Sequence, residues 1–67
     1  MAKYILGKPQ IKRLIEGKPV IDGYGRKYAV GPKVKELLQM INDHELYDKF
    51  SVIIENGGID IVQKNKN

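Results

Sequence analysis

The stretch FSVIIENGGIDIVQ, residues 50–63, carries the strongest structural signal in the chain. Two runs rich in Ile and Val flank the dipeptide Asn56-Gly57, which is typical of a two-residue type I′ turn between antiparallel strands. A turn at this dipeptide pairs Ile54 with Ile59 and gathers aliphatic side chains on one face of the hairpin. A three-residue loop would oppose Ile54 to Asp60, and a turn one residue later would oppose two acidic side chains. We therefore predict a hairpin over residues 50–63 with its turn at Asn56-Gly57.

In the residues before this hairpin, apolar side chains recur with the period of an amphipathic helix. Pro32 suits the first helical position, because the amide N–H that proline lacks has no helical partner there. Asn42 followed by Glu45 resembles an N-terminal capping box in which Asn replaces Ser or Thr. We predict a helix from Pro32 to about residue 42 with a short helical extension, and one continuous helix to Asp48 is the alternative. The apolar positions of this helix are Val34, Leu37, Leu38 and Ile41.

Two short elements are predicted near the start of the chain. Tyr4-Ile5-Leu6 is a candidate strand. Pro9 is suited to open a helix over residues 9–16, and Gly17 is suited to end it. So short a helix has little stability of its own and depends on packing against other elements.

A second hairpin is predicted over residues 19–30. The segment DGYG, residues 22–25, has the composition of a three-residue hairpin loop whose last glycine adopts the left-handed conformation. This register brings together side chains that attract each other across the strands. The predicted cross-strand pairs are Asp22 with Arg26 and Val20 with Tyr28.

The order of elements predicts the fold class. A strand, a helix, a hairpin, a helix and a second hairpin indicate an α+β fold, in which a small antiparallel sheet of two β-hairpins, with the N-terminal strand as a candidate addition, carries two helices on one face. We expect residues 1–63 to form a single domain and residues 64–67 to be a disordered polar tail. The strand order is not fixed by these patterns.

Composition excludes several kinds of chemistry. The 67 residues include no Cys and a single His, so a structural zinc site cannot be assembled within one chain. His44 and Ser51 have no spacing that suggests a catalytic pair. The acidic run from Asp43 to Asp48 lacks the glycine of a calcium loop and is interpreted as a solvated turn. We expect a non-catalytic cytoplasmic protein without metal or cofactor, and no apolar run is long enough for a membrane span.

Charge is unevenly distributed along the chain. Residues 1–36 contain nine Lys or Arg and three acids, a net charge of +6, whereas residues 37–67 have a net charge of −2. Cations interleaved with aromatic side chains suit a nucleic acid, whose phosphates bind the cations and whose bases stack on the rings. The bland interpretation is that these lysines only solubilise the surface and that Tyr28 packs across the hairpin. The residues we expect at a nucleic-acid surface are Lys12, Arg13, Tyr24, Arg26, Lys27, Lys33 and Lys35.

A protein partner is the rival hypothesis. Ile53 and Val62 are predicted to point away from the apolar face of the second hairpin, where a sheet covered by helices on one side leaves them exposed. The partner would be another protein or a second copy of this chain, bound through the sheet face or its edge. Isolated surface aliphatics are also common without any function.

Overall fold

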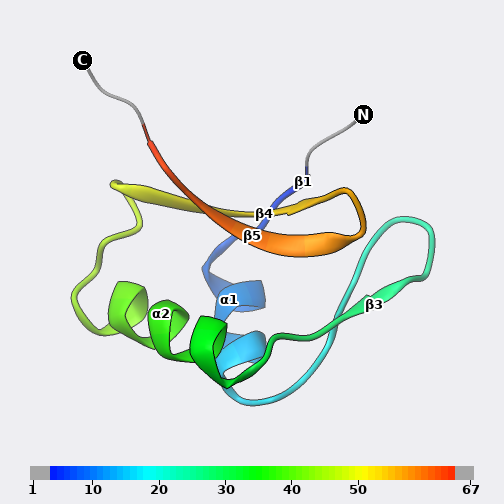
Figure 1. The fold of residues 1–67 in the computed structure, drawn as a ribbon, viewed down its shortest axis with the longest axis horizontal. Helices are drawn as coiled ribbons and strands as arrows, with labels where there is room; N and C mark the ends of the chain where they lie inside the picture. Colours follow the sequence, from blue (N-terminus) through cyan, green and yellow to red (C-terminus); the bar gives the residue numbers. More distant parts are fainter. Residues whose placement is uncertain (1–3, 65–67) are drawn as a thin grey trace.

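The computed structural model describes residues 4–64 and confirms an α+β fold of two helices and antiparallel strands (Figure 1). A three-stranded sheet forms one layer, and both helices pack beneath it. A small two-stranded hairpin extends to one side of the helical layer. The elements are β1 (Tyr4–Ile5), α1 (Lys8–Ile15), β2 (Val20–Ile21), β3 (Lys27–Tyr28), α2 (Pro32–Asp43), β4 (Phe50–Glu55) and β5 (Gly58–Gln63).

The β4–β5 hairpin has the predicted register. Ile54 lies opposite Ile59, and Glu55 lies opposite Gly58 across the two-residue turn. Asn56 and Gly57 have φ values of 55° and 80°, as a type I′ turn requires. β1 pairs with the other side of β4, so the strand order is β1-β4-β5 and β5 is an edge.

The first hairpin also has its predicted pairing but forms a sheet of its own. Val20 lies opposite Tyr28, and the amide of Asp22 donates to the carbonyl of Arg26 at 3.0 Å. β2 and β3 have only two residues each, and within the described residues they pair only with each other. The hairpin is joined to the molecule through the side chains of Val20 and Tyr28, which lie in the core. The expected single sheet is therefore two sheets.

The end of α2 differs from the predicted helical extension. Glu45 adopts a left-handed φ of 52°, and the amide of Leu46 donates back to the carbonyl of Ile41 at 2.9 Å. This bond closes the helix in a Schellman motif, so the predicted capping box at Asn42 is wrong. The side chain of Asn42 instead accepts a hydrogen bond from the hydroxyl of Tyr47.

The core lies between the three-stranded sheet and the two helices. Leu14 from α1, Leu38 from α2 and Val52 from β4 are almost fully buried. α1 and α2 contact each other, which allows an eight-residue helix that is marginal alone to persist. The remaining buried members of this cluster are Leu6, Ile11, Val20, Tyr28, Ile41 and Ile54.

Lys64 extends the β4–β5 ladder beyond the predicted domain end. Its amide donates to the carbonyl of Lys49 at 2.9 Å, and its Nζ donates to the carbonyl of Tyr47 at 3.0 Å. The expected tail therefore does not begin at Lys64. Its other residues, 65–67, lie outside the described part of the chain.

Candidate nucleic-acid interface

The tip of the β2–β3 hairpin is organised by the carboxylate of Asp22. Its Oδ1 accepts hydrogen bonds from the amides of Tyr24 at 2.8 Å and Arg26 at 2.9 Å. Its Oδ2 accepts a hydrogen bond from the hydroxyl of Tyr28 at 2.8 Å. Gly25 takes the predicted left-handed conformation, with φ at 84°. One side chain thus fixes the loop backbone and connects it to a tyrosine of the core.

These contacts set the protonation behaviour of the two groups. Removal from water acts to raise the pKa of Asp22, but hydrogen bonds from Arg26, Tyr28 and Tyr24 and the charge of Arg26 outweigh it and hold the pKa below 3.8. The bond to Asp22, followed by burial, raises the pKa of Tyr28 above 10.0. At neutral pH the pair is therefore a carboxylate bound to a protonated phenol.

The fixed tip displays an aromatic ring and a guanidinium together. Tyr24 is 85% exposed, whereas tyrosine is on average intermediate in burial. The guanidinium carbon of Arg26 lies 5.3 Å from the centre of the Tyr24 ring, a cation–π distance. The Nε of Arg26 also lies 3.8 Å from Asp22 Oδ2, so the guanidinium is held from two directions. This pairing of an open ring with a positioned cation is the arrangement that stacks on a base and binds a phosphate.

Cations of α1 lie beside the base of this hairpin. Arg13 donates from its Nε at 3.3 Å and from a terminal nitrogen at 3.0 Å to the carbonyl of Pro19, the residue before β2. Both bonds are exposed, so the guanidinium keeps an outward edge while it attaches α1 to the hairpin. Lys12 is the neighbouring exposed residue in the last turn of α1, and Lys27 is exposed in β3. The end of α1 and the hairpin are therefore neighbours, joined by the bonds of Arg13.

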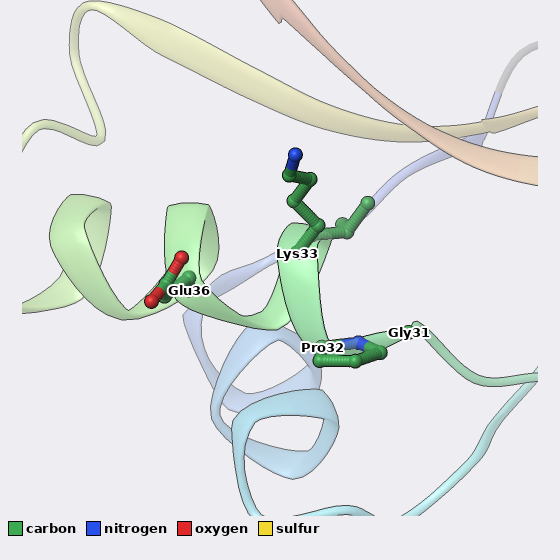
Figure 2. A pocket seen from close by; sticks show the side chains of 5 residues that line it. Gly31, Pro32, Lys33 and Glu36 are labelled. Carbon is green, nitrogen blue, oxygen red and sulfur yellow. The ribbon is translucent and has the colours of Figure 1, made fainter.

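The two lysines of α2 do not both join this surface. Lys33 and Lys35 are two residues apart, which places them about 200° apart around the helix axis. Figure 2 shows Lys33 extending from α2 on the side away from α1, toward the three-stranded sheet. The expected single face that contains all seven residues is therefore not formed. The other five expected residues belong to α1 and the hairpin, and all of them are exposed: Lys12, Arg13, Tyr24, Arg26 and Lys27.

The candidate protein-contact residues have different environments. Val62 is 38% exposed on the face of β5 turned away from the helices. The expected exposure of Ile53 is wrong, because its side chain is only 2% exposed. Ile53 lies in the central strand, between Ile5 of β1 and Asp60 of β5, and neighbouring strands cover a central position even on a face without helices.

Other surface features offer less chemistry. A shallow depression at the start of α2 is lined by a few residues, among which Lys33 and Glu36 point in different directions (Figure 2). Among residues 4–64, no three carboxylate or imidazole side chains come close enough to hold a metal ion. No helix in this described range has the length and apolarity needed to cross a membrane.

Sequence reasoning missed the central role of Asp22. The predicted pair with Arg26 treats Asp22 as one member of a cross-strand ion pair, whereas its oxygens mainly accept hydrogen bonds. An Asp directly before Gly-Tyr-Gly is a recognisable signal for such local bonding, because its side chain readily accepts the amide two residues ahead. The bond to Tyr28 depends on the hairpin pairing and has no local signal.

No protein-family model, curated protein or solved structure matches the chain.

Proposed function

We propose that this chain binds nucleic acid through the tip of the β2–β3 hairpin, with little sequence preference. The observation that carries the proposal is the 85% exposed ring of Tyr24, on a loop whose backbone is held by Asp22, with the guanidinium of Arg26 over the ring. A base stacks on this ring, while Lys12, Arg13 and Lys27 bind neighbouring phosphates. A ring needs an unstacked base to contact, so a single strand is the preferred form of the ligand.

Binding of a labelled oligonucleotide of about a dozen nucleotides, measured by fluorescence anisotropy, tests the proposal. Arg26 together with Lys12, Arg13 and Lys27 makes four cations, which predict that affinity falls with salt with a log–log slope of roughly −3 for a single strand. Binding to the single strand is expected to exceed binding to a duplex of the same length. Absence of binding at low salt, for single strand and duplex alike, would overturn the proposal.

Two matched pairs of substitutions separate stacking from charge. Tyr24→Leu removes the ring but leaves the backbone bonds to Asp22, and it is expected to weaken binding by about 5- to 100-fold. Tyr4→Leu alters another exposed tyrosine, on β1, and is expected to leave affinity unchanged. Lys27→Ala is expected to reduce the salt slope by about 0.7, whereas Lys49→Ala is not. Equal effects of the two tyrosine substitutions would remove the hairpin tip from the binding site.

A protein-binding role is the second candidate, and the exposed aliphatic side chains on the uncovered face of the three-stranded sheet favour it. Ile5 is 65% exposed and Val62 is 38% exposed, both on the face that the helices do not cover. Capture of a partner from cell extract that persists after nuclease treatment would favour this role. Val62→Lys should then disrupt the complex more than Lys27→Ala does.

A further inference from the structure

Within residues 4–64, β5 presents an open set of backbone hydrogen-bonding groups along the edge of the sheet. The backbone amide of Lys64 donates to the carbonyl of Lys49, the residue before β4. Along an antiparallel strand, every second residue directs its backbone groups toward the same neighbouring strand. The backbone groups of Val62 and Asp60 are therefore also directed toward β4, and the backbone groups of Ile61 and Gln63 point outward from the edge. The amide of Ile61 indeed bonds to the side chain of Asp60 at 3.0 Å and not to β4. Together with Ile59, these residues give the edge three outward positions.

The side chains on the uncovered face of β5 form a self-complementary row. Asp60, Val62 and Lys64 follow one another on this face, and all three are exposed. Two copies of β5 can run antiparallel about a twofold axis at Val62. Val62 then meets Val62 of the second copy, and Asp60 meets Lys64 of the second copy on both sides of the axis. The hydrogen-bonded residues in this register are Ile61 and Gln63, whose backbone groups point outward.

The symmetric registers centred on Asp60 and on Ile61 lack this complementarity. An axis at Asp60 would oppose the two carboxylates, and like charges directly opposite each other are destabilising. An axis at Ile61 would place Asp60 against Val62 and leave both charges of each copy without a partner. Cross-strand attraction therefore selects the axis at Val62.

We propose that the chain forms a twofold dimer by antiparallel pairing of β5 with β5 of a second copy, centred on Val62. The two sheets join into one of six strands. The exposed carboxylate of Asp60 gives up its bond to the Ile61 amide, and the ammonium group of Lys64 gives up its bond to the Tyr47 carbonyl, so that each pairs with the other across the axis. The opposite edge of each sheet is β1, which has two residues as described, so β5 is the longer edge for pairing. A twofold contact of this kind closes on itself and does not extend into fibres. The hairpin tip that is proposed for nucleic acid takes no part in this contact.

Sedimentation of the purified, nucleic-acid-free chain from about 10 µM to about 1 mM tests the proposal, since edge pairing of this size is expected to be weak. The expected result is a concentration-dependent shift from the mass of one chain to that of two. Asp60→Lys places like charges at both outer positions and is expected to raise the dissociation constant about tenfold or more. Lys64→Asp is expected to do the same, and the combined exchange restores dimerisation. Glu36→Lys, which changes net charge equally at an exposed position of α2, serves as the control.

A backbone variant tests the pairing independently of charge. Gln63→Pro removes an outward amide that takes no part in the β4–β5 ladder, and proline is tolerated at such edge positions. The variant is expected to keep the fold, checked by circular dichroism, and to sediment as a monomer. A wild-type chain that stays monomeric throughout, or a Gln63→Pro variant that dimerises as before, would overturn the proposal. Equal weakening by Asp60→Lys and Glu36→Lys would overturn the register at Val62.

Discussion

Replacement of Glu45 by glycine is expected to stabilise the fold. Glu45 holds a φ of 52° at the position directly after the helix cap, where the chain leaves α2. The equivalent position after α1 is Gly17, with φ at 85°, and the amide of Lys18 closes that helix with the same kind of bond to Arg13. Two helices of one molecule thus end in the same motif, but only the first has the residue that this conformation favours.

The magnitude follows from three contributions at this position. A side chain in the left-handed region costs about 1–2 kcal/mol, which glycine removes. Glycine also makes the unfolded chain more flexible, which lowers the free energy of unfolding by about 0.5–1 kcal/mol. Loss of a negative charge beside the negative end of the α2 dipole contributes a further stabilisation of about 0.3 kcal/mol at an exposed site. The net expectation is a gain of about 1 kcal/mol in the free energy of unfolding.

Thermal and urea unfolding followed by circular dichroism measure this gain. About 1 kcal/mol corresponds to a rise of roughly 4–8 °C in Tm for a domain of this size. Glu45→Gln removes the charge and keeps the side chain, so it isolates the electrostatic part and should yield only a small gain. Glu45→Ala keeps the strained backbone and should resemble Glu45→Gln. A Glu45→Gly variant no more stable than Glu45→Ala would refute the attribution of strain to the left-handed backbone.

Three further substitutions test other parts of the fold. Leu38→Ala, at a side chain with 0% exposure, is expected to cost about 2–5 kcal/mol and to leave much of this small domain unfolded, whereas the half-exposed Leu37→Ala should cost far less in urea titrations. Gly57→Ala, at a φ of 80°, is expected to lower the free energy of unfolding by about 1–2 kcal/mol in the same assay, and an unchanged midpoint would contradict the type I′ turn. Because the pKa of Asp22 is lowered in the fold, its charge stabilises the protein fully above 3.8, and this contribution is lost as the pH falls through the lowered value. The stability difference between wild type and Asp22→Asn should accordingly shrink below about pH 4, and a difference independent of pH would contradict this origin.

Local turn chemistry explains why much of the fold is predictable from sequence. Asn56-Gly57 fixes the β4–β5 register through two adjacent left-handed residues, which few other dipeptides accept so readily. The DGYG loop fixes the pairing of Val20 with Tyr28 in the same way. In both hairpins the partners are close along the chain, so backbone preference and cross-strand pairing agree.

Features that depend on distant contacts were not predictable in this way. The packing of the first hairpin apart from the main sheet depends on Val20 and Tyr28 entering the core, which no local pattern specifies. The burial of Ile53 depends on its central strand position, and the sequence does not give the strand order. Glu45 in a left-handed conformation runs against its own backbone preference, so only the packing around Leu46 and Tyr47 can explain it.

The sequence predicts which residues belong to the candidate site better than it predicts how they are arranged in space. Tyr24, Arg26 and Lys27 are adjacent along the chain, so any hairpin brings them to one tip. Lys33 and Lys35 are just as basic, but their separation around α2 directs at least one of them elsewhere. Counting charges along half of the chain takes no account of the angle between Lys33 and Lys35 around the helix. The net charge of +6 over residues 1–36 therefore overstates the extent of the basic surface.

The rigidity of the hairpin tip has its source in the core. Two strands of two residues each cannot hold a loop by their backbone bonds alone, since even longer isolated hairpins are marginal in water. Asp22 supplies the missing connection, because one of its oxygens binds the loop amides and the other binds the hydroxyl of Tyr28, whose ring is packed in the core. A mobile loop would lose backbone conformational entropy when Tyr24 stacks on a base, whereas the backbone of this tip has already been ordered on folding. The surface offered to a ligand is therefore prepared by the same packing that stabilises the fold.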